Sequence, residues 1–164
     1  MAYEFRRLTA EDIALVNDWI ARPHVAEWWI DGTGGPSEPL DEDILTEDEV
    51  RAWIVSFEGR PFAYMQDYTP HLDPQHHFFD RPPGTRGIDQ IIGEADMVGI
   101  GHGPAFIRQR VEQLFAEGAP CVVTDPHPKN ARAIRAYQKA GFAPYGEVIS
   151  PAWGPSLLME CKPE

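Results

Sequence analysis

The chain has 164 residues, 43% of them hydrophobic and 24% charged, with a formal net charge of −12 at pH 7. This length and composition predict one globular domain over residues 1–164 with a core of its own. The negative charge argues against a nucleic-acid partner, because phosphate contacts depend on clustered Lys and Arg. No window approaches the ~20 apolar residues of a membrane span, and no apolar signal segment follows Met1. With only Cys121 and Cys161 present, we expect a reduced, cytoplasmic protein without a disulfide framework.

The first part of the chain predicts one strand and two helices. Residues 3–8 read as a strand, and Thr9 with an acidic residue three positions later is typical of a helix N-cap. The apolar stripe that follows predicts a helix that ends before Pro23, and the next six residues predict a second, short helix ending in Trp28 and Trp29. These two indoles belong either to the core or to a wall against which a ring-shaped ligand stacks.

An acidic segment precedes a predicted hairpin. Seven carboxylates and no base lie between Glu38 and Glu49, where a helix is expected. They form either a solvated helix face, which we favour, or the rim of a site for a polyamine. Two β-rich runs, 52–57 and 62–68, flank a glycine-containing turn and predict a hairpin.

Residues 69–86 are rich in Pro, His and Asp and predict a long loop. Loops of this length in compact domains are usually either functional or disordered. The spacing of His71, His76 and His77 matches no standard metal site, so we expect a polar lid loop and no metal.

The remaining elements alternate between strand and helix. An apolar run at 87–93 predicts a strand, followed by a glycine-rich turn and an amphipathic helix. A strand at 120–125 and a helix at 131–140, ended by Gly141, precede two final strands at 142–149 and 156–161. The order β-α-α-β-β-β-α-β-α-β-β predicts an α/β sandwich with a mixed sheet.

The chain is organised around the glycine-rich turn. Gly99, Gly101 and Gly103 stand at alternate positions, and Pro104 follows in the first turn of the helix. Such a turn leaves backbone N–H groups at the positive end of the helix dipole, which favours a phosphate or pyrophosphate. The spacing fits neither the Rossmann fingerprint nor the P-loop. A plain strand-to-helix connection is the structural alternative.

A second motif follows, Asn130-x-x-Ala133-x-x-x-Tyr137-x-x-x-Gly141-Phe142. Together the two motifs resemble those of the GNAT N-acetyltransferases. The resemblance implies an α/β GNAT fold, with a mixed, mostly antiparallel central sheet flanked by helices and with splayed central strands. It also implies acetyl-CoA as cosubstrate and no metal. The residues that it assigns to the cosubstrate are Met97, Val98, Gly99, Ile100, Gly101, His102, Gly103, Pro104, Asn130, Ala133 and Tyr137. Val98 departs from the family's usual Gln or Arg.

Within this family the chain resembles the aminoglycoside 6′-N-acetyltransferases of type I-b. The blocks that carry the resemblance are His24-Val-x-Glu-Trp-Trp29, Arg86-Gly-Ile-Asp-Gln90, Thr124-Asp-Pro-x-Pro-x-Asn130 and Arg132-Ala-Ile-Arg-x-Tyr-x-Lys-Ala-Gly-Phe142. The loop 69–86 and the tail 150–156 match least, and the family's acidic residue in that tail is replaced near Trp153.

The resemblance implies acetylation of a primary amine on a polycationic small molecule, with the 6′-amine of aminoglycosides as the leading candidate and antibiotic resistance as the outcome. Acylation of a hydroxylysine-type amine in siderophore assembly, a non-catalytic CoA-binding module and acetylation of peptides remain alternatives. A C-terminal edge strand could pair between subunits, so a monomer or weak homodimer is expected.

The resemblance and the placement of side chains together assign roles. Asp89 is a carboxylate in an otherwise apolar strand, which predicts a general base, an ammonium anchor or a structural hydrogen bond. Asp125 would bind a second ammonium group or cap the following helix. Tyr137 would protonate the CoA thiolate or belong to the helix core, and strand N–H groups at 95–98 would stabilise the oxyanion. The residues assigned to the amine are Trp28, Trp29, Gln66, Tyr68, Asp89 and Asp125.

Overall fold

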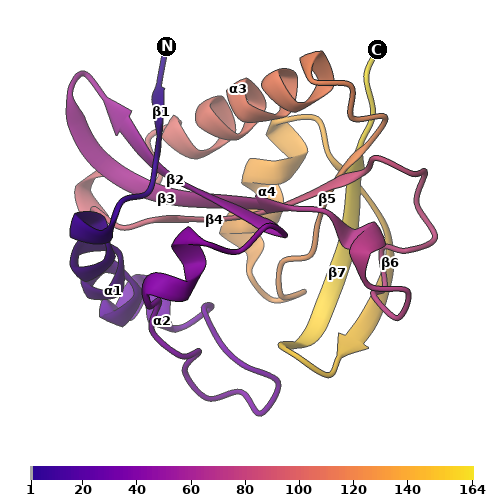
Figure 1. The fold of residues 1–164 in the computed structure, drawn as a ribbon, viewed down its shortest axis with the longest axis horizontal. Helices are drawn as coiled ribbons and strands as arrows, with labels where there is room; N and C mark the ends of the chain where they lie inside the picture. The colour runs from indigo at the N-terminus through magenta and orange to yellow at the C-terminus, as the bar shows by residue number, and fades with distance from the viewer. Residues whose placement is uncertain (1) are drawn as a thin grey trace.

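The computed structural model describes residues 2–164, and its elements follow the predicted order (Figure 1). The strands are β1 (Glu4–Arg7), β2 (Val50–Phe57), β3 (Arg60–Tyr68), β4 (Arg86–Ile92), β5 (Val122–Thr124), β6 (Ala143–Ser150) and β7 (Gly154–Cys161). The α-helices are α1 (Ile13–Ala21), α2 (Pro23–Ala26), α3 (His102–Ala116) and α4 (Ala131–Lys139). Short 3-10 turns are η1 (Ala10–Asp12), η2 (Glu42–Leu45), η3 (Pro70–Leu72) and η4 (Ala95–Met97).

One seven-stranded sheet runs in the order β1-β2-β3-β4-β5-β7-β6. Neighbouring strands are antiparallel except β4 and β5, which run parallel. The parallel pair is joined at only two positions, Arg86 opposite Val122 and Gly87 opposite Val123. Beyond them β4 continues to Ile92 without pairing to β5, so the centre of the sheet opens. This mixed, splayed sheet confirms the predicted fold class.

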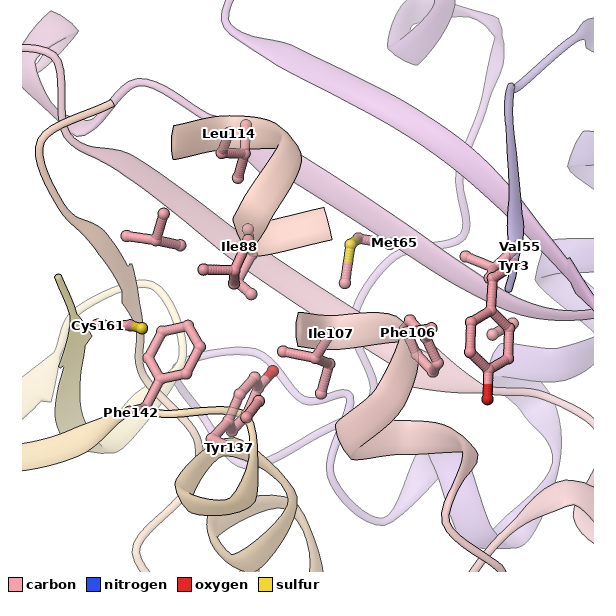
Figure 2. Packing of buried hydrophobic residues seen from close by; sticks show 14 of the residues in the cluster. Tyr3, Val55, Met65, Ile88, Phe106, Ile107, Leu114, Tyr137, Phe142 and Cys161 are labelled. Carbon is pink, nitrogen blue, oxygen red and sulfur yellow. The ribbon is translucent and has the colours of Figure 1, made fainter. Parts of the chain in front are cut away.

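Helices cover both faces of the sheet, because side chains alternate between the two faces along each strand. On one face α1 packs Val16 and Trp19 against Ile54, Tyr64 and neighbouring residues of the sheet. On the other face Phe106, Ile107 and Leu114 of α3 and Tyr137 of α4 pack against Met65 and Ile88. Figure 2 shows these side chains converging on the sheet.

Several local predictions are confirmed. Thr9 and Asp12 form the predicted capping box, and the backbone of Gly141 has a positive φ of 108° directly after α4. Two helices are shorter than predicted: α2 ends at Ala26, before the paired tryptophans, and the acidic segment forms only the 3-10 turn η2. This segment lacks a continuous apolar stripe, and most of its carboxylates are exposed, so packing does not extend the helix. No helix within residues 2–164 is long and apolar enough to cross a membrane.

Candidate active site

A cavity of about 570 Å³ opens where β4 and β5 diverge. Side chains from both faces of the sheet reach it, as do the glycine-rich turn, α4 and the β6–β7 hairpin tip. The predicted site residues on its wall are Trp28, Trp29, Gln66, Asp89, Val98, Gly99, Gly101, Gly103, Pro104, Asp125, Asn130, Ala133 and Tyr137. The fold therefore brings together most of the residues that the sequence assigned to the two substrates.

Asp89 lies at the centre of the cavity, in the part of β4 that has left β5. It stands opposite Gln66 of β3, whose Nε2 donates a hydrogen bond to its Oδ2 at 3.0 Å. The Tyr64 hydroxyl in turn donates to Oε1 of Gln66 at 2.7 Å, which fixes the orientation of the amide. Within residues 2–164 Asp89 thus has one hydrogen-bond partner, and its other carboxylate oxygen is available to a ligand.

The surroundings of Asp89 raise its pKa to about 7. Burial is the main cause, and the negative charge of Asp125 adds to it. The hydrogen bond from Gln66 and the proximity of His77 act in the opposite direction. A carboxyl group that titrates near neutral pH can take a proton from an ammonium group and release it again.

Asp125 lies at the end of β5 and is bonded to a side chain from the long loop. Nε2 of His77 lies 2.8 Å from its Oδ2. The alternative role of Asp125 as a helix cap is wrong, because α4 is capped by Asn130, whose side chain accepts a hydrogen bond from the backbone N–H of Ala133 at 3.3 Å. Asp125 remains on the cavity wall as a second carboxylate beside Asp89.

Tyr137 approaches the cavity from the opposite face of the sheet. The side chains of Thr124 and Gln90 lie near its hydroxyl group and act to lower its pKa. Burial, the largest cause, and the charges of Asp89 and Asp125 raise its pKa well above the ordinary value. The phenol therefore keeps its proton at neutral pH and can donate it.

The glycine-rich turn gives the cavity its backbone donors. Gly99 and Gly101 adopt positive φ angles of 76° and 99°, a conformation that side chains with a Cβ disfavour. Gly101 is the N-cap of α3 and provides no side-chain cap, so N–H groups of the first turn lack a side-chain acceptor there. This geometry suits an anionic group such as a pyrophosphate.

Three cations, which the sequence analysis did not assign, lie beside this turn. Arg132, Arg135 and Lys139 follow one another along one side of α4 and line the cavity. The structure gives none of them an ion pair within residues 2–164, although the protein is strongly acidic. Their spacing of three and four residues on a predicted helix could have revealed them.

Four predicted site residues do not line this cavity. Met97 packs in the main core, and Ile100 is 63% exposed. The His102 side chain is buried and hydrogen-bonded to the Tyr3 hydroxyl at 2.9 Å. The ring of Tyr68 covers Gly87, and its buried hydroxyl has no hydrogen-bond partner within residues 2–164. The side chains of Met97 and His102 are therefore engaged within the protein and do not face the cavity.

The backbone N–H groups at 95–98, which were expected to stabilise the oxyanion, do not belong to a strand. Residues 95–97 form the turn η4 rather than a strand. The N–H groups of Met97 and Val98 already donate to the carbonyl oxygens of Glu94 and Ala95. The prediction of free strand amides at 95–98 is therefore wrong, because β4 ends at Ile92.

The paired tryptophans separate into two environments. Trp28 lies on the cavity wall and packs against His127, with ring centroids 5.5 Å apart. Trp29 lines the same cavity but also packs edge-on against Tyr64 of the core, at 6.3 Å. The core and a ligand-facing wall were predicted as alternatives for these indoles. Trp29 belongs to both, so the two interpretations do not exclude each other.

No three His, Cys, Asp or Glu side chains in the described chain are grouped closely enough to hold a metal ion. The two cysteines, Cys121 and Cys161, are free thiols and both are buried.

Comparison with known proteins agrees with this geometry. Residues 9–149 match the model of the GNAT acetyltransferase domain. An aminoglycoside N(6′)-acetyltransferase type 1 from Klebsiella pneumoniae is 35% identical over 162 residues, covering 94% of this chain and 80% of the relative. A lysine N-acyltransferase, MbtK, from Mycobacterium tuberculosis is 25% identical, covering 88% of this chain and 70% of the relative.

A solved structure shares the fold over nearly the whole chain. The aminoglycoside acetyltransferase AAC(6′)-Ib in complex with ribostamycin and coenzyme A superimposes with a TM-score of 0.87 and is 33% identical, covering 99% of this chain and 94% of the other. These similarities and the splayed sheet lead to one conclusion: the chain belongs to the GNAT family of acetyltransferases.

Proposed function

We propose that this protein is an acetyl-CoA-dependent N-acetyltransferase whose acceptor is a primary amine of a polycationic small molecule, with the 6′-amine of an aminoglycoside as the leading candidate. The observation that carries the proposal is the cavity at the splayed strands. One end holds two neighbouring carboxylates, Asp89 and Asp125, and the other holds a free helix N-terminus beside three cations. An acidic end suits an amine, and a basic end suits the phosphates of a nucleotide cosubstrate.

The amine must lose a proton before it can react. Asp89 is suited to receive that proton, because its pKa of about 7 allows it to be ionised and still basic near neutral pH. Gln66 holds the carboxylate in place through one oxygen, and Asp125 attracts a second ammonium group of the same substrate. These roles require side chains only from β3, β4 and β5.

Acetyl-CoA supplies the acetyl group as a thioester, and the glycine-rich turn and α4 fit its anionic part. Arg132, Arg135 and the N–H groups after Gly101 would hold the phosphates. Tyr137 lies between the two ends and would donate a proton to the departing sulfur, since burial keeps its hydroxyl protonated.

Acetylation would remove one positive charge from an aminoglycoside, and so would weaken its attraction to anionic targets. Antibiotic resistance of a host that makes this protein is the expected consequence. We place the reaction in the cytoplasm and expect a monomer or weak homodimer.

The test is thiol release from acetyl-CoA with two sets of aminoglycosides. One set carries a 6′-amine and the other carries a 6′-hydroxyl at the same position. Release with the first set alone supports the proposal and fixes the regiochemistry. No release with either set, at millimolar amine, would exclude aminoglycosides as substrates.

Lysine-type amines are the second candidate, because the relative from Mycobacterium tuberculosis spans 88% of the chain and is a lysine N-acyltransferase. The same assay with lysine and hydroxylated lysine derivatives separates the two candidates. A non-catalytic CoA-binding role, suggested by Val98 in the turn, would show tight CoA binding without turnover on any amine. Peptide acetylation would appear as labelled protein in a lysate that is supplied with labelled acetyl-CoA.

A further inference from the structure

The long loop places an imidazole on one of the two carboxylates of the cavity. His77 lies in the loop between η3 and β4, 48 residues before Asp125, and its Nε2 lies 2.8 Å from Oδ2 of that residue. Both side chains are largely buried, with 15% and 4% exposed. An ionised carboxylate can only accept hydrogen bonds, so Nε2–H of His77 is the donor. One oxygen of Asp125 is thereby occupied.

The loop holds His77 in this position by packing. The next residue, Phe78, is completely buried and packs with Cys121, Val123 and Leu158 under β5 and β7. The ring of Trp153, from the β6–β7 hairpin tip, meets the His77 ring edge-on at 5.8 Å. His77 is therefore fixed between a core anchor and the hairpin tip, and its contact with Asp125 is part of the packed structure.

Oδ1 of Asp125 has no hydrogen-bond donor within the part of the chain that the structure describes, and Asp125 lines the cavity. The indole N–H of Trp153, on the same wall, is buried and also lacks a partner there. The wall thus offers a ligand one free acceptor, Oδ1 of Asp125. A molecule that carries an ammonium group can satisfy it.

We propose that His77 is a positioning residue for the amine substrate, which orients Asp125 by binding one carboxylate oxygen and directs the other oxygen to a second ammonium group. This role rests on the proposed amine acetylation. His77 acts through Asp125 and does not touch the reacting atoms. It therefore determines how well the enzyme binds amines with at least two positive charges.

The test compares His77→Leu, which removes the donor, with His77→Gln, whose side-chain N–H₂ can still reach the carboxylate. Steady-state kinetics are measured with an aminoglycoside that the wild type turns over. His77→Leu should raise the KM for the amine roughly 10- to 150-fold, the range for a hydrogen bond to a charged group, and change kcat less than about 3-fold. His77→Gln should recover most of the loss.

A double-mutant cycle with Asp125→Ala distinguishes positioning from a general effect on the fold. With the carboxylate absent there is nothing to orient, so His77→Leu should change the KM by less than about 2-fold in that background. His71→Leu is the matched control. His71 lies in η3, at the start of the same connection between β3 and β4; its Nε2–H donates one hydrogen bond to the Arg81 carbonyl at 2.5 Å, and it does not line the cavity.

The outcomes separate the two proposals. Equal losses in His71→Leu and His77→Leu, or additive losses with Asp125→Ala, would overturn the positioning role and indicate loop ordering alone. An unchanged amine KM in a folded His77→Leu variant, judged by its thermal melt and acetyl-CoA binding, would also overturn it while leaving amine acetylation intact. A wild type that acetylates no amine would instead refute the proposed function.

Discussion

At one end of the cavity, the groups that we assign to acetyl-CoA come from two continuous segments, the glycine-rich turn with α3 and the helix α4. At the other end Gln66, Asp89, Asp125 and Trp153 come from four separate segments, and His77, which binds Asp125, comes from a fifth. The first end depends on backbone conformation and positive charge, and the second on the placement of single carboxyl groups. The cosubstrate end should therefore tolerate side-chain changes that the amine end does not, and the predictions below test that contrast.

The largest effect is expected from Asp89→Asn. The amide is nearly the same size as the carboxyl group but cannot accept a proton, so kcat should fall by ~10²–10⁴-fold, the usual contribution of a general base. Calorimetry should show the acetyl-CoA Kd within about 2-fold of the wild type. The exposed Asp48→Asn is the control for loss of one negative charge. A variant that keeps a tenth of the activity would exclude Asp89 as the base.

Acidification should also act at the amine end. Because burial and the charge of Asp125 raise the pKa of Asp89 to about 7, the carboxyl group carries its own proton below that pH and cannot accept one from the amine. The value of kcat/KM should therefore fall about tenfold per pH unit below pH ~7. The acetyl-CoA Kd, followed over the same range, serves as the comparison. A profile that stays flat from pH 8 to 5.5 would show that Asp89 does not control the rate.

At the cosubstrate end the sensitive feature is the backbone. Gly101→Ala places a Cβ at a φ of 99°, which costs about 1–2 kcal/mol and distorts the turn, so we expect the acetyl-CoA Kd to rise ~10-fold. Gly118→Ala is the matched control, because Gly118 has a φ of 104° after α3 but does not line the cavity. Both variants should melt at similarly reduced temperatures, and only Gly101→Ala should bind acetyl-CoA more weakly. Equal binding by the two would place the cosubstrate elsewhere.

The smallest effects should come from single cations of α4. Arg132→Ala and Arg135→Ala each remove one partly solvated charge, worth ~1 kcal/mol, so the acetyl-CoA KM should rise roughly 3- to 5-fold. The effect should shrink as salt is added, because salt screens exposed charges. Lys162, which pairs with Glu160 at 3.5 Å outside the cavity, provides the control variant Lys162→Ala. A KM that responds equally to all three substitutions would reflect net charge alone.

The same contrast explains what the sequence could predict. The glycine-rich turn and the Asn130–Tyr137 motif are local patterns whose spacing specifies a backbone shape. The sequence could therefore predict their local structure and that both would lie at the same cavity. Asp89 was recognised because a carboxylate in an apolar strand is costly unless it has a function.

Contacts between distant segments could not be predicted in this way. The hydrogen bond between His77 and Asp125 depends on how an irregular loop packs. No periodicity or ligand spacing in the sequence predicts this contact. Tyr68 was assigned to the substrate, but its ring turns toward Gly87 and does not line the cavity. The oxyanion donors were misplaced because the end of β4 depends on the hydrogen bonds of the turn that follows.

The opening between β4 and β5 has one more consequence. Asp89 and Gln90 are consecutive residues, yet their side chains point to opposite faces of the sheet, one toward Gln66 and the other toward Tyr137. The sheet therefore separates the two sides of the site, and the opening between β4 and β5 connects them. Two molecules that approach from opposite sides can react through this opening. Inserting or deleting a single residue within β4 before Asp89 would exchange these two faces. Asp89 would then face the side of the thioester while Tyr137, on α4, kept its place, so the amine would lose its proton acceptor although every reactive group was still present.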